Sequence, residues 1–121
     1  MSRVDTGDEE PASIERLLNA LSAETTREIL TTLSEPMTVA ELVAECDISS
    51  STVYRRLNLL SDIGVVEEQI VVNDDGEQCS RYERNVERFS VSVGEDGRLT
   101  ARGVGLGGDG TEERTWNEEG S

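Results

Sequence analysis

Residues 38–64, TVAELVAECDISSSTVYRRLNLLSDIG, decide the fold of this chain. The stretch opens with Thr38, and Glu41 follows three positions later. This spacing predicts a capping box, in which each of the two side chains accepts a hydrogen bond from the other residue's backbone N–H. Met37 and Leu42 are placed to form the hydrophobic staple that accompanies such a start. The sequence therefore predicts a short helix that begins at Thr38.

A second helix is predicted after a tight turn. Ser49 is a good helix-capping residue, and Val53, Leu57 and Leu60 then recur at a spacing that gives a helix one apolar face. Gly64 ends this pattern, because glycine readily adopts the left-handed conformation in which many helices stop. Two short helices joined in this way indicate a helix-turn-helix unit.

The second helix carries adjacent arginines, Arg55 and Arg56, in a chain that is otherwise strongly acidic. A helix with an apolar face on one side and positive charge on the other can pack against a core and still present cations to DNA. The alternative is an ordinary solvated helix face, with or without pairing of the two arginines to acids of the same protein.

Two more helices are predicted before residue 38, after an acidic leader at residues 1–10 that we expect to be flexible. Pro11 fits the first turn of the earlier helix, and Ser22 can cap the later one. Their inward-facing residues follow helical spacing in two groups, Ile14, Leu17, Leu18 and Leu21, then Ile29, Leu30 and Leu33.

The pattern changes from helical to extended after Gly64. Residues 65–72 are rich in β-branched side chains, residues 73–76 form a turn signal, and residues 77–85 return, which predicts a β-hairpin. Alternation at residues 89–93, followed by a turn and residues 98–102, predicts a second short hairpin.

Residues 103–121 are rich in glycine and acids, and we expect a disordered tail there. Trp116 stands alone in this tail, either as an incidental residue or as an exposed anchor for a partner. The predicted fold is therefore α+β, with about four helices, a hairpin and a second short hairpin in one domain at residues 11–102.

Composition suggests a compartment and a solvent. The net charge is −15, all 11 basic residues are arginine, and histidine is absent. An acid excess without lysine resembles the proteins of salt-accumulating archaea. At about 1 M salt the Debye length is only ~3 Å, so the acidity does not exclude a nucleic-acid partner. Without an apolar signal segment or a membrane-length apolar run, we expect a cytoplasmic protein.

The predicted order is four helices, of which the last two form the helix-turn-helix unit, followed by a hairpin. This is the order of elements in the winged helix-turn-helix fold. Residues 20–67 resemble the ArsR-type family of transcriptional regulators in detail, and the resemblance extends over about residues 13–85. The residues that carry it are Leu21-Ser22, Arg27, Ile29-Leu30, Thr38, Glu41-Leu42, Ile48-Ser49, Ser51-Thr52-Val53, Arg55, Leu57, Leu60, Gly64-Val65 and Arg81-Tyr82.

This resemblance implies that the helix after Ser49 lies in the major groove of double-stranded DNA. Arg55 could then fork onto a guanine, and Arg56, more to the side, is the better phosphate candidate. The residues expected to contact DNA are Ser50, Ser51, Thr52, Tyr54, Arg55, Arg56, Asn58 and, in the wing, Arg81.

The wing departs from the family pattern, because its tip carries Asp74 and Asp75 instead of basic residues. Carboxylates beside phosphates repel, so we predict that the tip stays out of the minor groove. Arg81, and also Arg84, could still touch the DNA backbone from the returning strand.

No metal, cofactor or catalytic activity is expected. Thiolate sensors of the family carry a Cys-x-Cys pair, whereas only Cys46 falls in that region and Ala44 stands where its partner would be. Soft metals need several Cys or His ligands. Cys46 and Cys79 are expected to be unpaired thiols, unless folding brings them together as a redox pair. General-base histidine and a phosphate-binding Gly loop followed by Lys are both absent.

The function expected from these features is a sequence-specific DNA-binding transcriptional regulator, a repressor that acts as a homodimer by occluding a promoter. Palindromic half-sites favour two-fold proteins. No helix is predicted after the wing, so the dimer would use the first helix and the extra hairpin. The alternative is a winged helix that binds other proteins and not DNA, which the charge and the acidic wing tip would favour.

Overall fold

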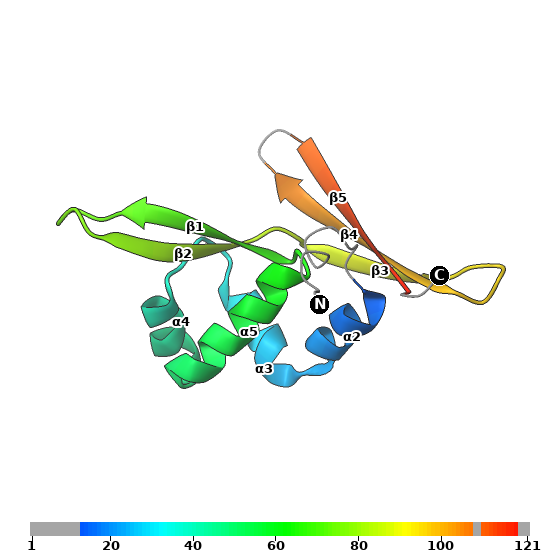
Figure 1. Cartoon of the computed structure of the whole chain (residues 1–121), viewed down its shortest axis with the longest axis horizontal. Coiled ribbons are helices and arrows are strands. Elements are labelled where there is room, and N and C mark those ends of the chain that lie inside the picture. The colour runs from blue at the N-terminus through cyan, green and yellow to red at the C-terminus, as the bar shows by residue number, and fades with distance from the viewer. Residues whose placement is uncertain (1–12, 108–109, 119–121) are drawn as a thin grey trace, which may run out of the picture.

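The computed structural model describes residues 13–107 and 110–118, so the expected acidic leader lies outside the described residues. Helices come first along the chain and antiparallel strands follow, which is the α+β winged helix-turn-helix architecture that the sequence predicts (Figure 1). The elements are α2 (Ile14–Ser22), α3 (Glu24–Thr32), α4 (Val39–Cys46), α5 (Ser50–Asp62), β1 (Val66–Val72), β2 (Gln78–Arg84), β3 (Arg88–Val93), β4 (Leu99–Gly107) and β5 (Gly110–Asn117).

The boundary between α2 and α3 differs from the prediction by one residue. Ser22 does not cap α3 but ends α2, and its hydroxyl donates a 2.8 Å hydrogen bond to the Asn19 carbonyl. Ala23 takes the cap position without a side-chain hydrogen bond. A serine hydroxyl can bond back to the preceding helical turn as well as forward to the next helix, and the spacing of apolar residues does not distinguish these choices.

The helix-turn-helix unit has the caps that the sequence predicts. Both bonds of the capping box are present, from the Glu41 N–H to the Thr38 hydroxyl at 3.2 Å and from the Thr38 N–H to the Glu41 carboxylate at 2.9 Å. Asp47 ends α4 in the left-handed region, with φ 59°. The Ser49 hydroxyl then accepts from the Thr52 N–H at the start of α5.

The end of α5 sets the direction in which the wing leaves. Gly64 has φ +86°, its N–H donates to the Ser61 carbonyl, and the Val65 N–H donates to the Leu60 carbonyl. These are the two bonds of a Schellman motif. The chain therefore turns sharply at Gly64 and enters β1 two residues later.

The wing is the hairpin of β1 and β2, and it extends away from the helices (Figure 1). Its strands pair from Val66 opposite Arg84 to Val72 opposite Gln78. Met37 forms a further antiparallel bridge to Tyr82, with N–H to carbonyl distances of 3.0 and 2.7 Å. This bridge fixes the base of the wing to the start of the helix-turn-helix unit.

A second sheet, in the order β3-β4-β5, replaces part of the tail expected to be disordered. The predicted second hairpin is present, but β4 continues to Gly107 and β5 pairs with it, from Gly107 opposite Gly110 to Thr100 opposite Asn117. The prediction of disorder is therefore wrong for residues 103–107 and 110–117, and the folded domain extends beyond residue 102.

Two glycines explain why a Gly-rich segment forms a strand here. A Cβ on Gly105 would lie 2.0 Å from the Asn85 carbonyl oxygen, and one on Gly103 would lie 2.8 Å from the Val86 side chain and 2.9 Å from the Trp116 ring. These glycines allow β4 to cross closely over residues 85–86. They are packing positions, not a linker.

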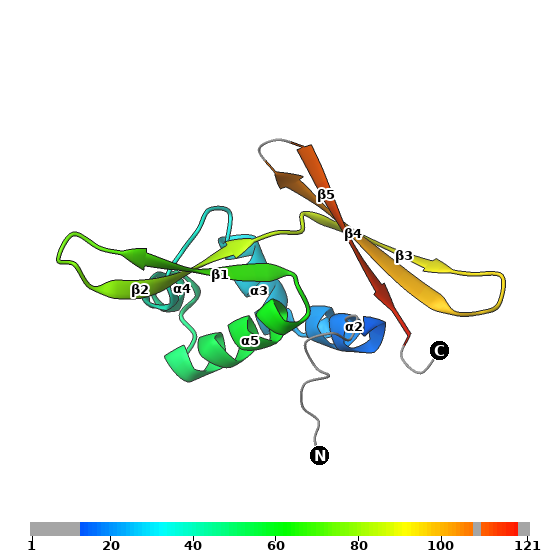
Figure 2. The same cartoon turned by 45° about the horizontal axis from the view of Figure 1, so that its top comes forward.

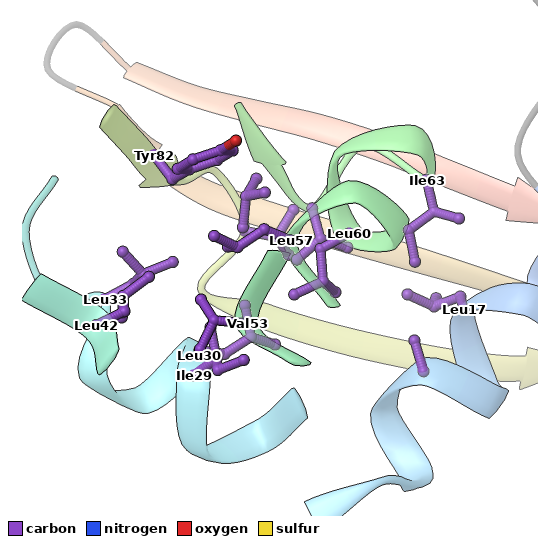
Figure 3. Packing of buried hydrophobic residues seen from close by; sticks show 14 of the residues in the cluster. Leu17, Ile29, Leu30, Leu33, Leu42, Val53, Leu57, Leu60, Ile63 and Tyr82 are labelled. Carbon is purple, nitrogen blue, oxygen red and sulfur yellow. The ribbon is translucent and has the colours of Figure 1, made fainter. Parts of the chain in front are cut away.

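The hydrophobic core joins the helices to both sheets. Figure 3 shows side chains of α3, α4 and α5 packing together on the side of Tyr82, with Leu17 of α2 near Ile63 at the other end of the cluster. Trp116 of β5 is 1% exposed, so it is neither an incidental tail residue nor an exposed anchor. Among the described residues, no helix is long and apolar enough to cross a membrane.

Candidate nucleic-acid interface

One face of α5 is turned to solvent along its whole length. Val53, Leu57 and Leu60 are fully buried on the other side. The exposed residues recur in steps of one helical turn, which places them in a single stripe opposite the buried face. This outer stripe consists of Ser50, Ser51, Tyr54, Arg55 and Asn58, and it ends at Asp62, which pairs with Arg16.

Thr52 and Arg56 lie at the margins of the outer stripe, and both are half-buried. The Thr52 hydroxyl accepts a 3.0 Å hydrogen bond from the Ser49 hydroxyl, so it is already engaged in capping the helix. The Nε of Arg56 is shielded from solvent and has no hydrogen-bond partner within the described residues. A buried donor without a partner costs about 1–3 kcal/mol, so an acceptor that reached the Arg56 guanidinium would stabilise this side chain.

No ion pair joins an arginine of α5 to an acid within residues 13–107 and 110–118. The ion pairs within the described residues join Arg16 to Asp62 and Arg98 to Asp96, each at 3.8 Å. Arg55 takes part in neither. The charge of the α5 arginines is therefore available to an external partner, and pairing to acids is not seen within the described residues.

The first turn of α5 is suited to an anion. It contains no acidic residue, and the hydroxyls of Ser51 and Thr52 lie 3.4 and 3.0 Å from the Ser49 hydroxyl. Helix N-termini carry a partial positive charge and free N–H groups, which favour phosphate. The outer stripe thus begins at an end of the helix where a phosphate oxygen would be stabilised.

Arg81 and Arg84 of β2 have different roles. Arg81 is exposed opposite Gln69, on the other face of the wing from the buried Tyr82. Arg84 instead donates to the carbonyls of Val86 at 2.7 Å, Leu30 at 3.0 Å and Glu87 at 3.3 Å. Its guanidinium ties the end of α3 to the segment after the wing. The expectation that Arg84 contacts DNA is replaced by this internal role.

The wing tip is acidic and ordered. The Asn73 side-chain oxygen accepts from the N–H groups of Asp75 and Glu77 at 3.0 and 2.9 Å, which holds the turn. Asp74 and Asp75 are exposed at this turn. Negative charge is therefore fixed at the end of the wing.

The joint between α5 and the wing contains groups that sequence reasoning missed. Burial raises the pKa of the Tyr82 phenol above its ordinary value of 10.0, and the neighbouring Glu68 carboxylate and Tyr54 phenol raise it further. The Ser80 hydroxyl also donates to Glu68. Tyr82 therefore lies at the base of the wing, where Tyr54 of the outer stripe is near enough to affect its pKa. Tyr82 lies opposite Glu68 across the hairpin. This cross-strand pairing was the signal from which the interaction could have been predicted.

Trp116 is a second residue whose position was missed. Its indole N–H donates a 2.8 Å hydrogen bond to the Ile63 carbonyl, at the C-terminal cap of α5. Its ring lies 5.8 Å from that of Phe89. The second sheet is therefore attached directly to the end of α5. The sequence signal for this strand was the two-residue spacing of Arg114 and Trp116, which places both side chains on one face if the segment is extended.

The two cysteines differ in their burial and in their surroundings. Cys46 is buried and its thiol donates to the Thr32 hydroxyl at 3.3 Å, whereas Cys79 is half-buried on β2. Both are free thiols. No group of three or more His, Cys, Asp or Glu side chains that could hold a metal ion occurs in the part of the chain that the structure describes.

Comparison with known proteins agrees with this geometry. A family model described as a helix-turn-helix domain matches residues 21–69, which run from the end of α2 through α5 into β1. The search of curated proteins found no match. Residues 21–69 thus carry a helix-turn-helix domain, and the strands that follow make it a winged one.

Proposed function

We propose that this protein is a sequence-specific DNA-binding transcriptional regulator that places α5 in the major groove. The observation that carries the proposal is the outer stripe of α5, which has no acid in its first turn and lies within a matched helix-turn-helix domain. The major groove admits an α-helix and displays a different donor and acceptor pattern for each base pair.

Arg55 is the proposed base-reading residue, because its guanidinium can donate two hydrogen bonds to a guanine. Arg56 and the N-terminus of α5 are assigned to phosphates, as is Arg81 at the side of the wing. Ser50, Ser51, Thr52, Tyr54 and Asn58 complete the proposed contact set. The carboxylates of Asp74 and Asp75 keep the wing tip out of the minor groove.

The regulator is proposed to act in the cytoplasm as a homodimer that represses by occluding a promoter. A two-fold protein matches two half-sites of a palindrome and doubles the recognition surface. The ArsR-type resemblance supports the regulatory role. The charge of −15 and the absence of lysine support work at high salt, as in haloarchaea.

The test is binding to genomic DNA fragments in molar KCl by the wild type and by Arg55→Ala. Loss of one bidentate contact costs about 1–3 kcal/mol, so we expect affinity to fall roughly tenfold or more. Arg102→Ala is the matched control, because Arg102 is an exposed arginine on β4, outside the proposed contact set. Equal affinities for all three proteins would show that α5 is not the reading helix.

A second candidate function is a winged helix that binds another protein. The wing favours it, since Ile70 and Val72 are 61% and 66% exposed beside the acidic tip. The buried Trp116 removes the support that an exposed tryptophan would have given. Purification from cells distinguishes the candidates: recovery of a stable protein partner without nucleic acid would favour this function, and recovery of DNA would favour regulation.

A further inference from the structure

The outer edge of β3 is open. β3 pairs with β4 on one side, and no described strand pairs with it on the other. The β3–β4 hairpin points away from the wing in both views, so the wing does not cover this edge (Figure 2). An uncovered strand edge presents unpaired N–H and C=O groups that can template pairing with another chain.

The hydrogen bond that closes the hairpin fixes which residues face the open edge. The Gly94 N–H donates to the Arg98 carbonyl at 2.8 Å, so Gly94 is directed toward β4. Backbone groups alternate in direction along an antiparallel strand. Phe89, Val91 and Val93 therefore direct their N–H and C=O groups outward.

The side chains of these residues extend an apolar face to the same edge. Val91 lies opposite Ala101, which in turn lies opposite Trp116, so all three share one side of the sheet. That side is buried at Ala101 and Trp116, but Val91 and Val93 are 50% and 69% exposed. Among the residues that the structure describes, none covers the apolar surface at Val91 and Val93.

Charge distinguishes β3 from the other edge strands. The edge strand β1 carries Glu67 and Glu68, and β5 carries Glu113, whereas the only charged residue of β3 is Arg88. β3 also lacks the proline, lysine or inward-facing charge that commonly protects an edge. In a chain with net charge −15, β3 therefore brings fewer acids to a strand pairing between two copies than β1 or β5 would.

We propose that β3 pairs with β3 of a second copy of this chain, antiparallel across a two-fold axis, to give one continuous six-stranded sheet. The inference deepens the proposed function, because it names the interface of the proposed homodimer. An isologous contact of this kind is self-complementary and closes at two chains. It leaves α5 of each copy uncovered by the strand pairing.

The proposed register is the one that pairs all the residues whose backbone groups face outward. In an antiparallel pair, two-fold axes pass beside hydrogen-bonded residue pairs and also beside the non-hydrogen-bonded pairs between them, so the outward groups alone do not place the axis. Only an axis at Val91 pairs all of residues 89–93. Val91 then lies opposite its own counterpart, and Phe89 lies opposite Val93 of the second copy.

Disulfide trapping tests both the interface and the register. Hydrogen-bonded antiparallel partners have Cα atoms about 5.5 Å apart, within the range that a disulfide can bridge. In a Cys79→Ser background, Val91→Cys should convert to a covalent dimer under mild oxidation. Val93→Cys is the matched control, because its counterpart would lie several residues away, and it should stay uncross-linked. Equal cross-linking of the two variants, or none in either, would overturn the proposed register.

Opposite charges at Val91 provide a second test. Sedimentation without DNA should give twice 13.2 kDa for the wild type and 13.2 kDa for Val91→Glu and Val91→Arg alone. Mixing the two variants should restore the dimer mass, with the buried Trp116 fluorescence confirming that each is folded. Dimers that persist in both separate variants, or a wild type that stays monomeric, would refute the interface.

These measurements separate the interface from DNA recognition. Arg55→Ala should sediment as a dimer, because Arg55 lies on α5 and not on the second sheet. If Arg55→Ala keeps full DNA affinity while Val91→Glu becomes monomeric, the proposed reading helix is wrong and the β3 interface stands. If Arg55→Ala loses DNA affinity while Val91→Glu stays dimeric, the β3 interface is wrong and the proposed DNA-recognition helix stands.

Discussion

Gly105 lies against the backbone rather than against a side chain, which leaves it little room to change. A Cβ there would come within 2.0 Å of the Asn85 carbonyl oxygen and 3.1 Å of its carbon. Backbone cannot rotate away as a long side chain can, so β4 itself would have to move. We predict that Gly105→Ala destabilises the fold by about 3 kcal/mol, the upper range for overpacking.

Urea unfolding monitored by Trp116 fluorescence measures this effect. Gly76→Ala is the control, because Gly76 has φ +83° but open space around it, and the strain alone costs about 1 kcal/mol. A similar decrease in the free energy of unfolding in Gly105→Ala and Gly76→Ala would mean that β4 does not cross closely over Asn85. The sequence shows both glycines, but only the fold reveals that one provides a turn and the other a close contact.

At the scale of elements, the helix-turn-helix unit follows from local chemistry. Thr38, Glu41, Ser49 and Gly64 each satisfy backbone groups within a few residues of themselves, so their roles are predictable from spacing. The outer stripe of α5 is predictable for the same reason, although its contacts with DNA stay a prediction. Arg84 is the counterexample, because its partner at Leu30 is 54 residues away and no local pattern announces it.

The joint between the wing and α5 should respond to alkaline pH. The folded-state pKa of Tyr82 is raised above 10.0, chiefly by burial and then by Glu68, so the folded state holds the phenolic proton more tightly than the unfolded state. The stability from this group is complete below pH 10 and is lost as pH rises through the folded-state pKa. We predict that the free energy of unfolding falls above pH 10, and less so in Tyr82→Phe. Urea titrations at pH 8 to 11 measure it. Equal slopes for both proteins would contradict the assignment.

At the scale of the whole molecule, the second sheet is the part of the fold that amino-acid composition does not predict. Glycine and acid content predict disorder for residues 103–121, yet β4 and β5 bury Ala101 and Trp116 against the helical domain. A prediction of disorder from composition uses the average content of a whole segment. Burial in β4 and β5 depends instead on every second residue, because these residues share the face of the sheet that packs on the helices. The same alternation leaves Val91 and Val93 exposed at the edge. The predicted second hairpin and the proposed dimer interface are therefore two consequences of one strand pattern.

The net charge of −15 should make the stability of the whole molecule depend on salt. The Debye length grows from ~3 Å at 1 M to ~30 Å at 0.01 M, so acids that are screened in concentrated KCl repel across the entire domain in dilute buffer. The ion pairs Arg16–Asp62 and Arg98–Asp96, both between exposed side chains, offset little of this repulsion.

We predict that the melting temperature falls steadily as KCl is lowered from molar to millimolar concentration. The double variant Asp74→Asn with Asp75→Asn is the matched comparison, because it removes two exposed charges at the wing tip without touching the core. It should melt higher than the wild type in dilute buffer and at nearly the same temperature in molar KCl, where the removed charges were already screened. Calorimetry across the salt series measures both. A melting temperature that does not change with salt would show that the acids are balanced locally, and the salt-adapted character inferred from composition would then be wrong.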